Sequence, residues 1–153
     1  MQKDVKSHAK QRKEETEMNV ILGNGAFMPE FAHETDAGAD LRSPVDVVVP
    51  ARGSAVIDTG VHVEIPEGYT IFLKSKSGLN VKHDLIGTGT IDSGYTGTIK
   101  VKLYNLGDTD YQILRGDKII QMVILPCAYC EFTQVEKFAE TERGDGGFGS
   151  TGR

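Results

Sequence analysis

Short apolar runs alternate with turn residues along the chain from Met18 onward. In the runs VHVEI (61–65) and TIKVKLY (98–104), apolar and polar residues alternate one by one, which is typical of strands with one buried face. Other apolar runs, NVIL, VDVVVP and KIIQMVIL, are each followed by glycine, proline or another turn residue. No stretch in the middle of the chain shows helical periodicity. This pattern predicts an all-β domain, closed as a barrel or packed as a sandwich.

The two ends of the chain depart from this pattern. Residues 1–17 carry five Lys or Arg and four Asp or Glu with little apolar content, which predicts a charged N-terminal extension without a core. The last eleven residues, RGDGGFGSTGR, include five glycines and have almost nothing to bury. We therefore expect a β domain over 18–138 and a flexible glycine-rich C-terminal arm over 139–153.

Length, composition and charge narrow the class of protein. With 153 residues and 39% hydrophobic content, the chain is long enough for one domain with a core. A net charge of -5 and a pI near 5.3 argue against binding nucleic acid. No apolar run reaches the roughly 18 residues that a membrane span needs, and the N-terminus lacks the apolar stretch of a signal peptide. The expected location is the cytoplasm, away from membranes.

The two cysteines form a CAYC segment, Cys127 to Cys130. A zinc site would need two further ligands at recognisable spacing, but the four histidines are scattered singly along the chain. A redox motif would be followed by a helix, whereas EFTQVEKF (131–138) has the pattern of a strand. We therefore expect two reduced thiols in or beside a strand and assign them no function.

Small and polar residues gather in five clusters between the predicted strands. Each cluster alone is typical of a turn or a linker. Together and in this order they resemble the five motifs of the trimeric dUTPase family, from Met18 to the C-terminus, and the pair GTIDSGYTG and RGDGGFGSTG is the most specific part of the match. The clusters are AGADLRS (37–43), KSKSGLN (74–80), GTGTIDSGYTG (87–97), RGDKIIQ (115–121) and the C-terminal tail.

The resemblance implies both an assembly and an activity. It implies a jelly-roll-like β-barrel or sandwich subunit in a homotrimer with shared active sites. The activity it implies is hydrolysis of dUTP to dUMP and pyrophosphate, with Mg²⁺ on the triphosphate. Such an enzyme limits uracil incorporation into DNA and supplies dUMP for dTMP synthesis.

The third cluster is expected to hold the catalytic and nucleoside-binding residues. By resemblance, Asp92 orients the water that attacks the α-phosphorus and accepts its proton. The Tyr95 ring would stack under deoxyribose and leave no room for a 2′-hydroxyl. Backbone groups around Gly89 and Ile91 would bind uracil in a slot too tight for the methyl group of thymine. An ordinary turn aspartate that caps its own backbone is the alternative for Asp92.

The triphosphate contacts are expected from the second and fourth clusters. By resemblance, the Ser77 hydroxyl, the Gly78 backbone N–H and the Gln121 amide hold the phosphate chain. The family commonly has arginine where this chain has Lys76, and lysine keeps the charge but loses the two-pronged contact of a guanidinium.

The arm and the metal complete the expected site. By resemblance, phosphate contacts come from the arm while Phe148 stacks on uracil, and the arm closes over a nucleotide bound by another subunit. No protein side chain is expected to bind Mg²⁺ directly. Asp40 would lie near its water shell, or else be a turn carboxylate that supports Arg42 or a neighbouring strand. The arm residues expected to contact phosphate are Arg143, Gly147, Ser150 and Thr151.

Two other functions remain open. A dCTP deaminase has a similar fold but uses a glutamate on the strand after the third motif, where this chain reads VKLYN and offers Asn105. A nucleotide-sensing regulatory trimer would bind a protein partner, and the charged residues 1–17 are a surface that it could use.

Overall fold

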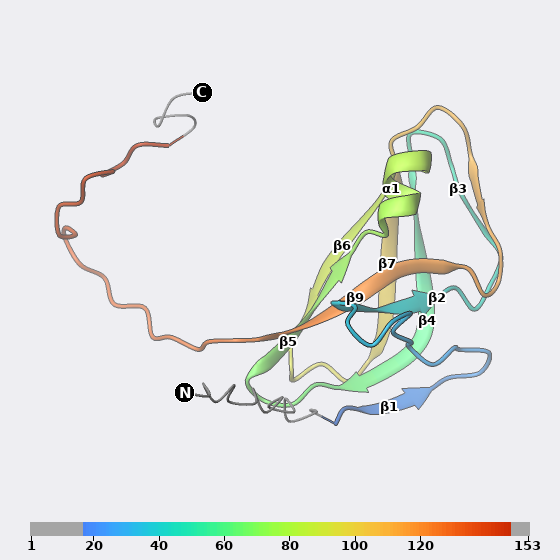
Figure 1. Ribbon diagram of the computed structural model, residues 1–153, viewed down its shortest axis with the longest axis horizontal. Coiled ribbons are helices and arrows are strands. Elements are labelled where there is room, and N and C mark those ends of the chain that lie inside the picture. The colour runs from blue at the N-terminus through green and yellow to red at the C-terminus, as the bar shows by residue number, and fades with distance from the viewer. Residues whose placement is uncertain (1–16, 148–153) are drawn as a thin grey trace, which may run out of the picture.

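The structure, a computed structural model, describes residues 17–147 (Figure 1). The expected N-terminal extension, apart from Glu17, and the tail residues Phe148, Ser150 and Thr151 lie outside the described residues. In order along the chain, the described elements are β1 (Asn19–Leu22), β2 (Gly38–Arg42), β3 (Val47–Val49), β4 (Ser54–Glu64), β5 (Tyr69–Lys74), α1 (Ser77–His83), β6 (Leu85–Ile91), β7 (Thr98–Asn105), β8 (Tyr111–Ile113) and β9 (Lys118–Pro126).

Seven strands form one antiparallel sheet in the order β1-β4-β7-β6-β5-β9-β2, and β3 pairs with β8 in a separate two-stranded sheet. The large sheet curls on itself, so that its two halves face each other across the core (Figure 1). Strand β6 joins the halves because it pairs with β7 on one edge and with β5 on the other. The expectation of an all-β domain is confirmed.

The predicted alternation of apolar and polar residues matches the alternation of buried and exposed side chains along the strands. On β7, Ile99, Val101 and Leu103 are at most 2% exposed, while Lys100 and Lys102 between them face outward. The same holds for the second half of β4, where valines at 61 and 63 are buried. The core therefore consists almost entirely of aliphatic side chains from alternate strand positions, each burial contributing about 1.5–3 kcal/mol.

The expectation that the middle of the chain holds no helix is wrong. Helix α1 follows β5 directly, begins after the extended residue Lys76 and ends where Asp84 adopts left-handed φ and ψ of 55° and 26°. It is only seven residues long and has no fully buried residue, so it has no apolar stripe for periodicity to reveal. None of the helices in residues 17–147 is long and apolar enough to cross a membrane.

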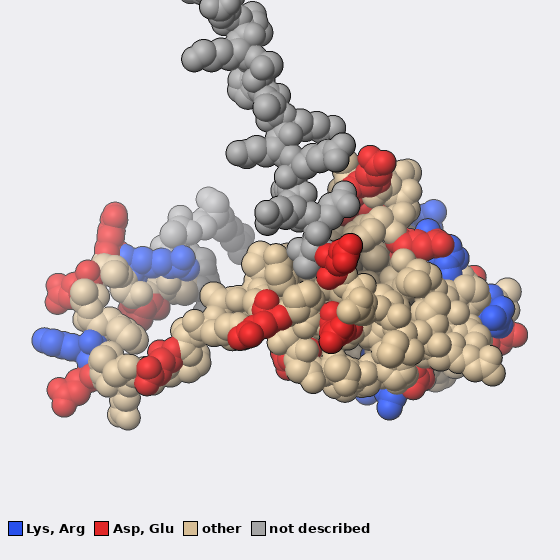
Figure 2. All heavy atoms as spheres, turned by 90° about the horizontal axis from the view of Figure 1, so that it is seen from below, with Lys and Arg blue, Asp and Glu red and all other residues tan. Residues whose placement is uncertain are grey.

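Beyond β9 the chain leaves the domain, and residues 127–147 extend away from it in both views (Figures 1 and 2). The strand expected over 131–138 is wrong, because no strand forms there and these residues are exposed. Alternating residues need a neighbouring strand to pair with, and this segment has none among residues 17–147. Cys127 and Cys130 are free thiols, and Cys127 follows the last residue of β9.

The start of the extended segment 127–147 is held against the domain by the turn before β5. The Cys127 N–H donates to the Gly68 carbonyl (2.7 Å), and the Gly68 N–H donates to the Tyr129 hydroxyl (3.2 Å). These two contacts fix where the arm leaves the domain.

Asn105 closes the turn that follows β7 and is 1% exposed. Its amide donates to the carbonyls of Val49 (3.0 Å) and Thr109 (2.8 Å) and accepts from the Gly107 N–H (2.9 Å). A buried backbone group without a partner costs about 1–3 kcal/mol, so one side chain here satisfies several costly groups.

We expect Asn105→Ala to lower the free energy of unfolding by about 2–4 kcal/mol, since it strands buried backbone groups. Urea unfolding at fixed protein concentration measures the change. Asn24→Ala is the matched control, because Asn24 is exposed and its side chain makes no hydrogen bond in the part of the chain that the structure describes. This substitution should change stability by less than about 0.5 kcal/mol. Equal effects of the two substitutions would contradict this role of Asn105.

Candidate active site

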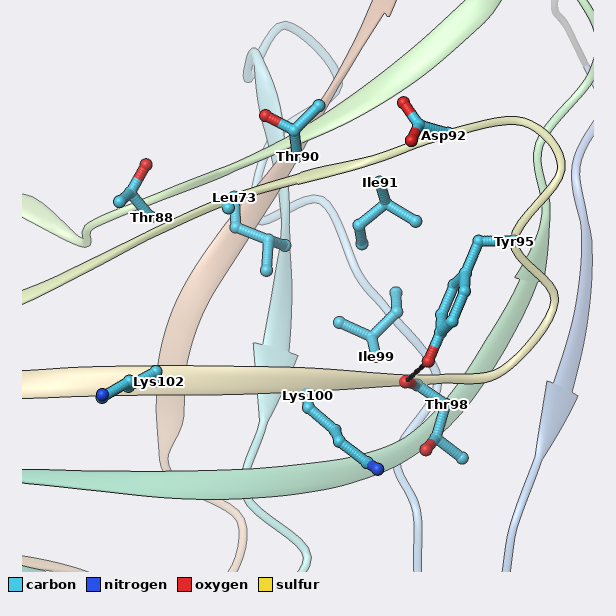
Figure 3. Close-up of a pocket in the computed structure, with 11 residues that line it drawn as sticks. Leu73, Thr88, Thr90, Ile91, Asp92, Tyr95, Thr98, Ile99, Lys100 and Lys102 are labelled. Carbon is cyan, nitrogen blue, oxygen red and sulfur yellow. Dashed lines mark hydrogen bonds between the residues drawn. The ribbon is translucent and has the colours of Figure 1, made fainter.

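Strands β6 and β7 diverge into a fork that encloses a pocket of about 300 Å³. They pair only from Leu85 to Gly87, and beyond Gly87 the strand β6 pairs with β5 while β7 pairs with β4. Leu73, Ile91, Tyr95 and Ile99 line the pocket, with Asp92 at its mouth (Figure 3). The change of strand partners therefore opens an apolar slot between two strands.

The walls of the fork have unpaired backbone edges. Successive residues of a strand direct their N–H and C=O groups to opposite edges. The carbonyl of Ile91 accepts from the Thr70 hydroxyl of β5 (2.9 Å), so Ile91 and Gly89 face β5, whereas Thr88 and Thr90 face the fork. On the opposite wall, Ile99 faces β4, where its carbonyl accepts from Thr59 (2.7 Å). The sequence predicted a backbone slot in the hairpin around Gly87 to Tyr95 and named Gly89 and Ile91 within it, and in the structure Thr88 and Thr90 of the same stretch face the fork.

Asp92 and Tyr95 are the ends of the turn at the tip of the fork. The Tyr95 N–H donates to the Asp92 carbonyl (3.0 Å), which confirms the expected β-turn. The Tyr95 hydroxyl donates to the Thr98 carbonyl (2.8 Å), which holds the ring inside the fork (Figure 3). The Asp92 carboxylate is exposed and makes no hydrogen bond to another described residue, so it does not cap its own turn. It is free to bind a water molecule.

A second cluster lies around Asp40 on β2. Asp40 is 4% exposed and binds two lysines, with Lys76 at one carboxylate oxygen and Lys118 at the other (2.7 Å). Burial alone would raise the pKa of Asp40, but hydrogen bonds and positive charge from Lys118 and Lys76 hold the pKa below its usual range. The cluster ties together β2, the start of α1 and β9.

This cluster decides between the expected partners of Asp40 and adds one residue. Asp40 lies in a strand rather than a turn, and it supports the neighbouring strand β9 through Lys118, as one alternative expected. It does not support Arg42, which donates to the Gly116 carbonyl (2.8 Å) and lies 3.6 Å from Glu30. Lys118 was missed, although it lies in the fourth motif next to Asp117.

Gln121 lies beside this cluster, opposite Asp40 on the neighbouring strand. Its amide donates to the Ser75 carbonyl (3.3 Å). The side chain crosses over Gly38, where a Cβ atom would come within 2.9 Å of the Gln121 carbonyl oxygen. Glycine in the first motif is therefore needed to leave room for Gln121. Ser77 and Gly78, both exposed, begin α1 just after Lys76.

The structure brings the expected residues together in two groups and leaves a third apart. Gly89, Ile91 and Tyr95, which are expected to bind the base and sugar, line the fork pocket, while Phe148 lies outside the described residues. The described residues expected to bind phosphate do not line this pocket. Arg143 and Gly147 lie on the arm, where Arg143 donates to the Gly146 carbonyl (2.9 Å). A single chain therefore does not assemble all of these residues around one nucleotide.

The donor set suits a magnesium ion that is carried by phosphate. Within residues 17–147 there is no group of three His, Cys, Asp or Glu side chains that could hold a metal. Magnesium keeps several waters and takes substrate phosphate oxygens, so it does not require such a group. Asp40 is already bound by two lysines, which leaves it poorly placed to bind an ion directly.

Comparison with known proteins gives consistent matches over most of the chain. A sequence model described as dUTPase matches residues 25–152. The deoxyuridine 5'-triphosphate nucleotidohydrolase of Anaplasma marginale is 44% identical over 140 residues, which cover 88% of this chain and 95% of the relative.

Two phage structures are similar in fold as well. The Staphylococcus bacteriophage 80alpha dUTPase with dUPNHPP has a TM-score of 0.82 and 38% identity, covering 91% of this chain and 100% of that chain. The description of that structure says that phage dUTPases control transfer of virulence genes by a proto-oncogenic G protein-like mechanism. A mutant dUTPase from phage phi11 of S. aureus, with a TM-score of 0.75 and 37% identity over 80% of this chain and 99% of that one, is described as coordinating a structural Mg(II) ion.

We expect Asp40→Asn to destabilise the protein by about 2 kcal/mol at pH 7, because Lys76 and Lys118 then lose the negative charge with which both of them pair. The folded pKa of Asp40 lies below the unfolded value of about 3.9, so the carboxylate stabilises the fold above about pH 4, and this stabilisation is lost as pH falls through the folded pKa. Urea unfolding of both proteins from pH 7 to pH 3 should show the difference shrinking with acid.

The control for this measurement is Asp108→Asn. Asp108 pairs with Arg52 at 2.6 Å, but both side chains are largely exposed, so its removal should change stability little at any pH. A gap between wild type and Asp40→Asn that stays constant down to pH 3 would contradict a lowered pKa of Asp40 in the folded protein.

Proposed function

Because the chain belongs to the dUTPase family, we propose that it is a dUTP pyrophosphatase, which hydrolyses dUTP to dUMP and pyrophosphate around Asp92. The observation that carries this proposal to particular residues is the fork pocket, with an unbound carboxylate at its mouth and a tyrosine ring inside (Figure 3). No glutamate lines this pocket in the described part of the chain, which speaks against a dCTP deaminase.

The fork suits a uracil base and a deoxyribose. Backbone groups of Thr88 and Thr90 face the space between the strands and supply donors and acceptors in a fixed plane, while Gly89 and Ile91 belong to the same wall. A backbone slot of fixed width rejects the extra methyl group of thymine. The ring of Tyr95 lies where it would pack under the sugar and exclude a 2′-hydroxyl.

The chemistry is an in-line displacement at the α-phosphorus. Asp92 orients a water molecule and accepts its proton as the new P–O bond forms, and the bond from the α-phosphorus to the bridging oxygen breaks to release pyrophosphate. Ser77, Gly78 and Gln121 hold the phosphate chain. Bound Mg²⁺ neutralises charge on the triphosphate.

Lys76 has to serve both Asp40 and the phosphates. Its ammonium group has three donors, of which Asp40 takes one. Lys118 stays on the other oxygen of Asp40, so the carboxylate keeps a partner when Lys76 turns toward a phosphate oxygen. We therefore retain Lys76 as a phosphate-binding residue, as a point charge rather than a fork.

The complete site is proposed to form in a homotrimer. One chain keeps the fork and the phosphate-binding residues apart, and its arm extends away from its own domain. Phe132 and Phe138, in the extended segment 127–147, are 92% and 88% exposed, which suits a segment that a neighbouring copy covers. Arg143 and Gly147, together with Phe148, Ser150 and Thr151, would then close over a nucleotide bound by other subunits.

A regulatory role is the second candidate function. It is favoured by the likeness to the phage 80alpha enzyme, for which control of virulence-gene transfer is described. A protein partner would add to dUTP hydrolysis rather than replace it, because the fork and the phosphate-binding residues are all present. The charged residues 1–17 are the first place to test for such a partner.

We expect the wild-type chain to release protons and pyrophosphate from dUTP with Mg²⁺ far faster than from dTTP, dCTP or UTP. Asp92→Asn should lower kcat for dUTP by about 10³-fold or more while dUTP still binds, because it loses the group that accepts the proton. Asp108→Asn is the matched control and should leave kcat unchanged. Ammonia release from dCTP, or an Asp92→Asn variant with full activity, would contradict the proposal.

Two truncations test the proposed division of the chain. Removal of 143–153 should lower kcat for dUTP by at least about 100-fold while the domain stays folded, because the arm positions the triphosphate and excludes water. Removal of 1–17 should leave kcat and KM unchanged. Circular dichroism and size-exclusion chromatography report the fold and assembly of both. Full activity without 143–153 would exclude the arm from catalysis.

A further inference from the structure

Ser75 occupies the point where β5 ends and the chain turns toward α1. Its hydroxyl donates to the Gly87 carbonyl (2.9 Å) and accepts from the Gly87 N–H (2.9 Å). In the register of β5 and β6, Lys74 lies opposite Thr88, so Ser75 would lie opposite Gly87 if β5 continued. One side chain thus replaces the missing rung of the ladder.

Gly87 is also the point where the fork opens. It is the last residue of β6 that pairs with β7, opposite Leu103. A Cβ atom at Gly87 would come within 2.8 Å of Ile120 Cδ1 and 2.9 Å of Leu103 Cδ2, so the backbone here lies directly on the core. Having no side chain, Gly87 has no anchor of its own. Its position is set by the core beneath it and by the Ser75 hydroxyl at its edge.

Ser75 touches the phosphate-binding group as well. Its carbonyl accepts from the Gln121 amide (3.3 Å), and Lys76 and Ser77 follow it in the chain. The same residue therefore joins the base of the fork to the residues proposed to hold phosphate.

We propose that Ser75 is a positioning residue that fixes the width of the fork and so the discrimination between uracil and thymine. The proposal rests on the assignment of the fork as the base pocket. Gly87 is buried, and without the hydroxyl its N–H and C=O lose their partner where β5 has already ended. Buried N–H and C=O groups without hydrogen-bond partners are costly, so the Gly87 backbone moves toward other partners. This movement shifts the part of β6 that carries Thr88 and Thr90 and forms one wall of the fork. A wider slot admits the methyl group of thymine.

The test compares kcat/KM for dUTP and dTTP in the full-length protein. We expect Ser75→Ala to lower the dUTP-to-dTTP ratio by at least about tenfold, the lower end of what one methyl group is worth in a fitted pocket. Ser75→Thr keeps the hydroxyl and should restore the ratio to within about threefold of wild type. The matched control is Ser54→Ala, which removes an exposed hydroxyl that makes no hydrogen bond to another residue within 17–147 and should leave the ratio unchanged.

Two results would overturn the proposal. One is a folded Ser75→Ala protein that hydrolyses dUTP with the wild-type ratio, and the other is a loss of selectivity in Ser75→Thr as large as in Ser75→Ala. If Ser75→Ala does not fold, Ser75→Cys, with a weaker donor and acceptor, should show a smaller loss of selectivity, and a wild-type ratio there also refutes the proposal. Wild-type turnover of dUTP is measured in the same assay, so a failure of the proposed function is seen separately.

Discussion

Strand β6 pairs with β7 as far as Gly87 and with β5 beyond it, and this change of partner shapes the whole candidate site. Because β7 meanwhile stays with β4, the two strands of one hairpin are pulled into different halves of the curled sheet. The space between them is bounded by core side chains below and by backbone edges on both sides. Each wall belongs to an antiparallel ladder, and the β4–β7 ladder shifts its register between Asp58 and His62, beside the pocket.

The buried carboxylate of Asp40 provides the second organising contact. One carboxylate held by two ammonium groups leaves an excess of positive charge at the surface between β2, β9 and the start of α1. The contact links segments far apart in the sequence, and its desolvation cost is offset only while both lysines remain close. An anionic substrate suits such a place, because it can take one lysine without leaving the carboxylate unpaired.

The sequence predicted the parts of this structure that depend on local pattern. Alternation in β4 and β7 predicted their buried faces, because the two-residue period of a strand reports burial directly. Helix α1 was missed because all its residues are at least partly exposed, as Val81 is at 79%. The strand expected over 131–138 failed because alternation does not supply a pairing partner.

In the candidate site, too, the sequence predicted the contacts between neighbouring residues but not the contacts between distant strands. Asp92 and Tyr95 could be placed at the ends of one turn because they are close in sequence, and the structure keeps them there. The lysine contacts of Asp40, the clamp of Ser75 on Gly87 and the free backbone edge of Thr88 depend on the order of strands across the sheet. Pairing across a sheet brings together distant segments, and no local period encodes it.

The open fork also has a consequence for solubility. Two facing strands with unpaired edges are the template that extended peptides add to, and proteins usually protect such edges with charge, bulges or covering loops. Here the opening is closed at one end by the Gly87 pairing and at the other by the turn that starts at Asp92. A planar base can enter it from the side, but a polypeptide would have to thread through. The geometry that admits a nucleotide therefore also keeps the protein from aggregating through this edge.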